Sequence, residues 1–283
     1  MTMHSEAQAN EPRPAPDAVA SAQAVLPTYT VATLVNDRAQ YAAMCASFRA
    51  HGFDEACCEM IAAFNPPSAY SALNELLSRA KGQYVIICHQ DVRLIGDDRA
   101  RLDQRLAELD ALDSSWAVAG NAGGALPGKL AMRISDPHGE DRTMGTLPAR
   151  VVSLDENFLV VKAASRVAFS RDLDGFHLYG ADICLVADVL GYSAYVIDFH
   201  LRHLSPGRKD ATFTKAEAAF RTKWSRALKP RWMQTTCTLL RIGGVAGTGA
   251  PSGLLSRAYA GILRRTVTSD SVVPKRIARR SGT

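Results

Sequence analysis

Residues 84–94 read Tyr-Val-Ile-Ile-Cys-His-Gln-Asp-Val-Arg-Leu, and this stretch decides the predicted fold. Its first five residues have strand character, and the run ends abruptly at His89, Gln90 and Asp91. An apolar run bounded by polar residues is typical of a strand buried on both faces of a parallel sheet. Open α/β sheets bind ligands just beyond the carboxyl ends of such strands. A carboxylate there can hold a divalent cation against a phosphate, although an ordinary polar turn would carry the same residues.

The segments on both sides alternate between strand and helix patterns. Periodicity predicts strands at 29–35, 57–64, 84–88 and 116–119, with an amphipathic helix between each pair. This order predicts an α/β fold: a mostly parallel sheet with right-handed crossovers, flanked by helices, in a single domain.

The pattern changes after residue 120. Residues 120–150 are rich in Gly, Pro and charged residues, which predicts an inserted flexible loop. Beyond it, patterns predict short strands at 151–154, 158–161 and 195–199, and helices at 182–190 and 212–226.

The two ends of the chain differ in composition from its centre. Residues 1–26 are rich in Ala and Pro without periodicity and are predicted to be disordered. The main domain is predicted at 27–226, and residues 227–283 form a C-terminal extension with a Gly/Ser-rich linker at 243–256. Seven Arg and Lys and one Asp give residues 257–283 a net charge of +6, whereas the whole chain carries +5.

The composition of the chain limits the classes of protein to which it can belong. Hydrophobic content of 47% and charged content of 22% are ordinary for a soluble globular protein, and no apolar run is long enough to span a bilayer. The six cysteines are scattered without a CxxC pair, which predicts reduced thiols in a cytoplasmic protein. Because the positive charge is confined to the tail, no nucleic-acid partner is expected.

Four stretches of the chain resemble glycosyltransferase family 2, a family with the glycosyltransferase-A fold, in its bacterial surface polysaccharide branch. The resemblance covers roughly residues 29–225. The first stretch, from Ala72-Leu-Asn74 to His89-Gln-Asp91, is similar to the family's "N…A.G.Y…D.D" block. The others are Val152-Ser-Leu-Asp155 with Phe158-Leu-Val-Val161, then Gly175 through Asp182 to Gly191-Tyr192, and lastly His203-Leu-Ser-Pro-Gly207 with Lys223-Trp224.

The resemblance implies a divalent cation. Sugar transfer from a nucleoside diphosphate requires neutralisation of the leaving diphosphate, commonly by Mg²⁺ or Mn²⁺. Asp91 matches the final Asp of the family's Asp-x-Asp, and His89 stands in place of its first Asp. Imidazole suits Mn²⁺ better than Mg²⁺, so this departure leaves metal dependence open. His203 matches the family's late His, which implies a metal or diphosphate contact, although a lone His is often structural.

The resemblance also implies a carboxylate base, because an acceptor hydroxyl loses its proton as it attacks in an inverting enzyme. Asp182 is the first candidate and Asp155 the second. By its spacing to Gly191-Tyr192, Asp182 matches a later acid of the motif, and Gly180 falls where the usual base would stand. Asp182 could equally cap the helix that the pattern places there.

Residues at the ends of the first two strands are the candidates for nucleotide binding. In the family, residues at the positions of Asn36, Asp37 and Asn65 hold the base and ribose, and Asn74 opens the matched block. Short polar side chains are also ordinary turn formers, so both roles stay open for them.

The resemblance therefore implies a cytoplasmic glycosyltransferase that uses a nucleotide-sugar donor and a glycan or lipid-linked acceptor in surface polysaccharide synthesis. The alternatives are a catalytically inactive nucleotide- or glycan-binding relative, which His89 and Gly180 favour, and a nucleotidyltransferase. The second alternative would need a Gly-rich phosphate loop after the first strand, and residues 35–38 contain no glycine.

The C-terminal tail suggests peripheral contact with a membrane. Residues 255, 259, 262 and 263 are apolar and share one face of a predicted helix that precedes most of the basic residues. Such a helix can lie on an anionic bilayer, or it can pack on the catalytic domain.

Overall fold

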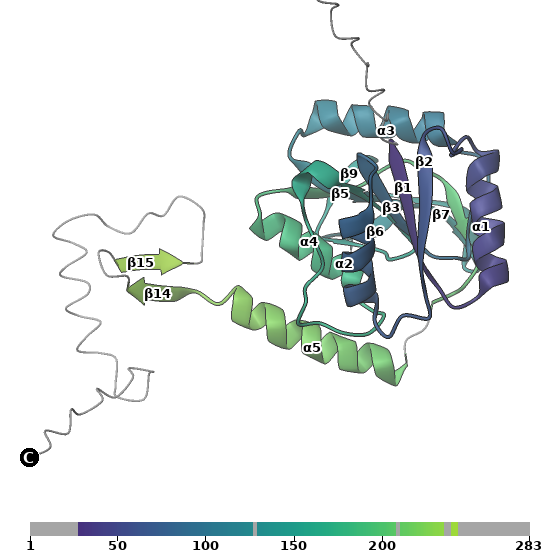
Figure 1. Cartoon of the computed structure of the whole chain (residues 1–283). Helices are drawn as coiled ribbons and strands as arrows, with labels where there is room; N and C mark the ends of the chain where they lie inside the picture. The colour runs from purple at the N-terminus through teal and green to yellow at the C-terminus, as the bar shows by residue number, and fades with distance from the viewer. Residues whose placement is uncertain (1–27, 127–128, 208–209, 235–238, 243–283) are drawn as a thin grey trace, which may run out of the picture. The chain divides into compact units, whose positions relative to one another are not determined.

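The computed structural model describes residues 28–126, 129–207, 210–234 and 239–242 (Figure 1). The predicted disordered segment, the Gly/Ser-rich linker and the basic tail with its amphipathic face lie outside the described residues. The chain divides into two compact units. The first ends at Pro206 and excludes 171–178, and the second combines 171–178 with the residues from Gly207 onward.

The first unit is built on a seven-stranded mixed sheet. Its strands, in spatial order, are β2 (Cys58–Phe64), β1 (Tyr29–Val35), β3 (Tyr84–Cys88), β11 (Phe158–Lys162), β5 (Trp116–Gly120), β12 (Ser193–Val196) and β9 (Ala149–Val151). The strands β1, β2, β3, β5 and β12 run in one direction, and β11 and β9 run in the other. The predicted α/β fold with a mostly parallel sheet is confirmed, with β11 inserted between β3 and β5.

Four helices flank this sheet, as expected (Figure 1). They are α1 (Arg38–Ala50), α2 (Ala69–Arg79), α3 (Arg99–Leu112) and α4 (Tyr179–Val189). The carboxylate of Asp37 accepts hydrogen bonds from the first turn of α1, and the carboxylate of Asp98 does the same for α3. Such bonds satisfy backbone donors that a helix leaves open at its start.

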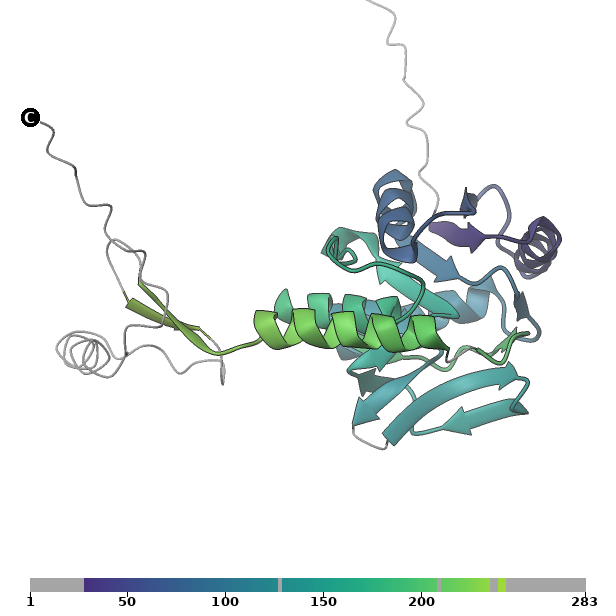
Figure 2. The same cartoon turned by 90° about the horizontal axis from the view of Figure 1, so that it is seen from below.

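The segment predicted to be a flexible loop instead forms most of a second, six-stranded sheet (Figure 2). Its main path runs β10 (Ser153–Leu154), β6 (Ala122–Leu126), β7 (Lys129–Asp136), β13 (Leu201–His203) and β4 (Val92–Leu94), and β8 (Gly139–Met144) pairs with β7.

The glycines that suggested a loop have a packing role. A Cβ on Gly123 would lie 2.3 Å from the carbonyl oxygen of Ser153, and a Cβ on Gly120 would lie 2.9 Å from that of Phe158. Only glycine allows the backbones to approach so closely, so these residues join the strands instead of loosening them. The prediction of a flexible loop at 120–150 was therefore wrong.

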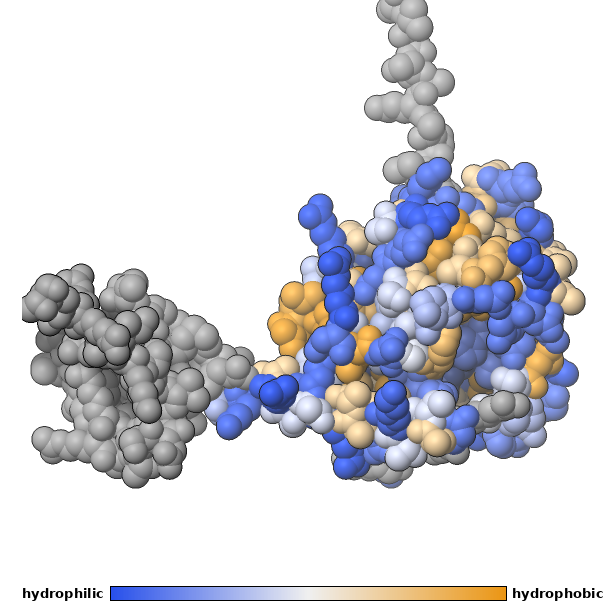
Figure 3. Space-filling view, turned by 60° about the horizontal axis from the view of Figure 1, so that its bottom comes forward, coloured by the Kyte–Doolittle hydropathy of each residue, from blue (hydrophilic) through white to orange (hydrophobic). Residues whose placement is uncertain are grey.

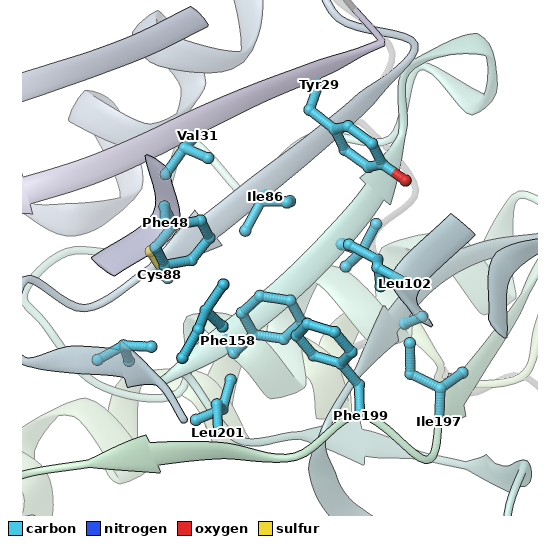
Figure 4. Packing of buried hydrophobic residues seen from close by; sticks show 14 of the residues in the cluster. Tyr29, Val31, Phe48, Ile86, Cys88, Leu102, Phe158, Ile197, Phe199 and Leu201 are labelled. Carbon is cyan, nitrogen blue, oxygen red and sulfur yellow. The ribbon is translucent and has the colours of Figure 1, made fainter. Parts of the chain in front are cut away.

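The core lies between the main sheet, helices α1 and α3, and the second sheet. It contains Ile86 and Cys88 of β3, Phe48 of α1 and Leu102 of α3. The rings of Phe158 and Phe199 stack with centroids 5.4 Å apart (Figure 4). Because successive residues of a strand face opposite sides, Val85 and Ile87 are buried on the other side of the sheet.

The second unit contains one long helix and a strand pair. The helix α5 (Ala211–Ala227) begins at Asp210, whose carboxylate accepts hydrogen bonds from Thr212 and Phe213. The ammonium of Lys223 pairs with Asp172, which also belongs to this unit. The strands β14 (Arg231–Gln234) and β15 (Leu239–Ile242) pair antiparallel.

Exposed apolar residues are dispersed. On the face shown in Figure 3, hydrophobic side chains lie in separate groups among hydrophilic ones. Phe64, Val152 and Leu190 are examples of exposed apolar side chains, and they come from separate parts of the chain. Among the described residues, no helix has both the length and the apolar character that crossing a bilayer requires.

Candidate active site

The carboxyl ends of β1, β2 and β3 meet at one edge of the main sheet. The strands β1 and β2 end level with each other, since Val35 pairs with Phe64. The strand β3 ends at Cys88 and continues into His89, whose N–H donates to the carbonyl of Asn157 at 3.0 Å. The polar residues that follow all three strands are therefore brought to the same edge, as predicted.

Antiparallel pairing between β4 and β13 brings His203 to this edge. His203 is the register partner of Val92, and the N–H of Leu204 donates to the carbonyl of Asp91 at 3.1 Å. These bonds place a late segment of the chain directly beside residues 89–91. Sequence patterns did not predict this strand pair, because β4 has only three residues.

His89, Asp91 and His203 form what we call the His–Asp–His cluster. One ligand atom from each lies within 4.8 Å of the others. The Nδ1 atom of His89 is 3.2 Å from Nε2 of His203, and this Nε2 is 3.4 Å from Oδ1 of Asp91. The hydroxyl of Ser205 also lies 3.2 Å from Nε2 of His203.

The surroundings set the charge of this cluster. Burial by itself would raise the pKa of Asp91, but the hydrogen bond and charge of His203, with the charge of His89, hold it well below its usual range. Asp91 is therefore ionised at neutral pH. Burial, followed by the charge of His203, lowers the pKa of His89. A carboxylate together with two imidazoles is a donor set that suits a divalent transition metal.

The cluster thus fits a divalent cation. Its three donors point to one place, and nitrogen donors favour Mn²⁺ over Mg²⁺, which prefers oxygen. A metal with three protein ligands keeps positions open for water or for substrate oxygens.

Gln90 joins the ends of β1 and β3. Its side-chain oxygen accepts the N–H groups of Asn36 and Asp37 at 3.0 and 2.9 Å, and its amide nitrogen donates to the side chain of Asn36. The carboxylate of Asp37 is bound by the first turn of α1. Asn36 and Asp37 therefore lie beside residues 89–91, and the bridging role of Gln90 was not predicted.

The other two nucleotide candidates are placed differently. Asn65 directly follows β2, is exposed and has a left-handed backbone with φ of 47°. Its N–H donates to the carbonyl of Val35 at 2.7 Å, so it belongs to the same edge. Asn74 lies in α2, and its amide exchanges two hydrogen bonds of 2.9 Å with the backbone of Phe169. The side chain of Asn74 therefore connects α2 to the segment that contains Phe169.

The two candidate bases differ in accessibility. Asp182 is fully buried in the first turn of α4, which begins at Tyr179, ahead of the predicted start. Its oxygens accept the N–H and the hydroxyl of Ser170 at 2.8 and 2.7 Å. Asp155 is exposed, and one of its oxygens accepts both side-chain and backbone N–H groups of Asn157. Since Asn157 also binds the backbone of His89, Asp155 lies on the turn beside the cluster.

Gly180 allows α4 to approach this turn. A Cβ there would lie 2.3 Å from the carbonyl oxygen of Leu154 and 3.2 Å from Cγ of Glu156. The position that the family motif fills with an acid therefore has no room for a side chain. The N–H of Gly180 instead faces the carboxylate of Glu156 at 3.5 Å.

Two cavities lined by described residues bear on the position of the site. One of about 170 Å³ opens beside His203 and is also lined by Asp136, Glu140 and Arg202. It is too small for a whole nucleotide sugar, since ligand pockets usually exceed about 300 Å³. The other, of about 500 Å³, lies between β9, β12 and α4 and includes no residue of the cluster. The candidate site is therefore defined by the convergence of His89, Asp91 and His203, and not by the size of a cavity.

Comparison with known proteins gives one clear relative. No protein-family profile matches the chain. A protein of Fuscovulum blasticum named "ATP synthase subunits region ORF 6" is 37% identical over 228 residues, which cover 76% of this chain and 91% of that protein.

Similar solved structures include glycosyltransferases. GalNAc-T7 with UDP, GalNAc and Mn²⁺ matches 64% of this chain and 44% of its own, with 9% identity and a TM-score of 0.46. The mannosyltransferase PcManGT from Pyrobaculum calidifontis, in complex with GDP-Man and Mn²⁺, matches 72% and 65%, with 12% identity and a TM-score of 0.46. TarS from S. aureus matches 63% and 37%, with 8% identity and a TM-score of 0.44. The chain covers less than two thirds of each of these proteins.

Proposed function

Because the chain belongs to the family of the Fuscovulum blasticum protein named ATP synthase subunits region ORF 6, a name that states no activity, we propose its function from the His–Asp–His cluster. The proposed function is a cation-dependent glycosyltransferase that takes its sugar from a nucleotide-sugar donor. The observation that carries the proposal is the convergence of His89, Asp91 and His203 at the edge where β1, β2 and β3 end. In open α/β sheets this edge is where ligands bind.

The cluster would hold the cation that the donor diphosphate requires. A divalent cation bound there supplies positive charge against the leaving diphosphate. Asp91 contributes the negative charge, and the two histidines contribute nitrogen donors. Asn36 and Asn65 would contact the nucleoside, and Gln90 keeps Asn36 in place.

We favour Asp155 over Asp182 as the base that takes the acceptor proton. A general base must reach the proton that it removes. Asp155 is exposed on the turn beside the cluster, and one of its oxygens holds Asn157. Asp182 is fully buried and binds Ser170 through both oxygens. An inverting outcome, a surface-glycan or lipid-linked acceptor, and a cytoplasmic or membrane-peripheral location are carried over from the family resemblance.

Donor binding tests the proposal directly. Thermal unfolding is measured with a panel of UDP-, GDP- and TDP-sugars, with and without Mn²⁺. A ligand at 100-fold over its Kd adds about 2.7 kcal/mol to stability. We expect one nucleotide class to stabilise the protein only with Mn²⁺, and Mg²⁺ to act more weakly.

Asp91→Asn should abolish this Mn²⁺-dependent stabilisation, because the amide keeps the shape of the side chain but loses the charge. Asp98→Asn is the matched control, since Asn is itself a good helix cap and Asp98 caps α3. No stabilisation by any donor, or unchanged Mn²⁺ dependence in Asp91→Asn, would contradict the proposal. Donor binding without hydrolysis or transfer would favour an inactive relative, and release of pyrophosphate from a nucleoside triphosphate and a sugar phosphate would favour a nucleotidyltransferase.

A further inference from the structure

Tyr179 connects the start of α4 to the His–Asp–His cluster. Its side chain is buried, with 3% of its surface exposed. Its hydroxyl lies 2.9 Å from Nε2 of His89 and donates to the backbone carbonyl of Glu156 at 3.2 Å. Tyr179 therefore contacts the ring nitrogen of His89 that faces away from the other ligands.

The hydrogen-bond roles follow from counting protons. A phenol has one proton, and the carbonyl oxygen of Glu156 can only accept. Both contacts of the hydroxyl are hydrogen bonds only if Tyr179 donates to Glu156 and its oxygen accepts from His89. The donor in that second bond is Nε2–H of His89.

A neutral imidazole with its proton on Nε2 has its lone pair on Nδ1. In His89, Nδ1 is the atom that lies 3.2 Å from Nε2 of His203 and that belongs to the cluster. We propose that Tyr179 is a positioning residue that holds His89 in the Nε2–H tautomer, with the lone pair of Nδ1 directed into the cluster. This inference rests on the proposed function, because it concerns how the same site receives its cation.

The packing around Tyr179 makes this role separable from folding. Its ring meets Phe169 and Tyr70 edge to face, with centroids 5.8 and 6.5 Å apart. Replacement by Phe keeps these ring contacts and removes only the hydroxyl. Partners of this kind change metal affinity by about 10–100-fold when they are removed.

Two measurements on Tyr179→Phe test the inference. Long-range proton–nitrogen correlation NMR of the metal-free protein identifies which nitrogen of His89 carries the proton, and titration with Mn²⁺ gives the affinity. In the wild type we expect Nε2–H at His89. In Tyr179→Phe we expect a mixture of tautomers and an affinity for Mn²⁺ lower by about 10–100-fold.

Tyr195→Phe is the matched control. It also removes a hydroxyl, one that donates to Asp113 at 3.0 Å, and both measurements should stay unchanged. A wild-type His89 with its proton on Nδ1 overturns the inference, as does an unchanged Mn²⁺ affinity in Tyr179→Phe when the wild type binds Mn²⁺. A wild type that binds no Mn²⁺ but shows the expected tautomer, lost in Tyr179→Phe, supports the positioning role and contradicts the proposed cation site.

Discussion

Gly180→Ala tests whether the close approach of α4 to the 154–156 turn positions the site. The added Cβ would lie 2.3 Å from the carbonyl oxygen of Leu154, whereas ordinary contacts begin at 3.4 Å. The first turn of α4 must therefore move by about 1 Å. Overpacking of this kind costs about 1–3 kcal/mol, and Ala in place of Gly in a helix recovers up to about 1 kcal/mol. We expect the free energy of unfolding to fall by about 1–2 kcal/mol.

The same movement should weaken the cluster. Tyr179 precedes Gly180, and its 2.9 Å contact with His89 would no longer be a hydrogen bond if it lengthened by about 1 Å. Urea denaturation followed by circular dichroism gives the stability, and a Mn²⁺ titration gives the affinity. Gly96→Ala is the control, since its Cβ meets no heavy atom within 4 Å. A Gly180→Ala variant with wild-type stability and wild-type Mn²⁺ affinity would refute this reasoning.

Asp182→Asn and Asp110→Asn each change a carboxylate that accepts hydrogen bonds from other residues. Asp182→Asn presents an amide N–H₂ to the donors of Ser170 and should cost about 1–3 kcal/mol of stability, measured in urea. Wild-type stability with turnover lowered by about 10²-fold or more would instead restore Asp182 as the base. Burial raises the pKa of Asp110, but hydrogen bonds from Lys162 and Trp116 outweigh it and lower that pKa. A carboxyl whose pKa is lower in the folded protein than in the unfolded chain stabilises the fold at any pH above its unfolded pKa of about 3.9. This stabilisation is lost as the pH falls through the folded pKa. The stability difference between wild type and Asp110→Asn should therefore be full at neutral pH and shrink below about pH 4, and a difference independent of pH would contradict this role.

Local periodicity was sufficient to predict the strands and helices up to residue 120 except β4, which has only three residues. It also predicted the strand that is β11 but not its position, because β11 enters the sheet between β3 and β5 from a distant part of the chain. Nor could it predict the second sheet, because Gly120 and Gly123 are ambiguous without their neighbours. A glycine signals a flexible loop or a close backbone contact, and only the packing distinguishes the two.

The candidate site was predicted in part. His89 and Asp91 follow from the end of a buried strand, and His203 followed only from the family resemblance, because the pairing of β4 with β13 places it there. Tyr179 was missed, since a tyrosine at the start of a helix has no sequence pattern that links it to a distant histidine. For Asp182 the motif carries less information, because an acidic residue in a matching motif can lie buried and bound by Ser170.

In the proposed site, a cation held by His89, Asp91 and His203 binds the diphosphate of a nucleotide. Pulsed electron paramagnetic resonance of Mn²⁺ bound to the protein, with the nucleoside diphosphate selected by the donor panel, tests both halves of this proposal in one experiment. We expect magnetic coupling of Mn²⁺ to histidine nitrogen, lost in the double variant His89→Ala/His203→Ala, and coupling to phosphorus in the same wild-type sample. Mn²⁺ that couples to phosphorus but not to histidine nitrogen, or that stays free in solution, would contradict the proposal.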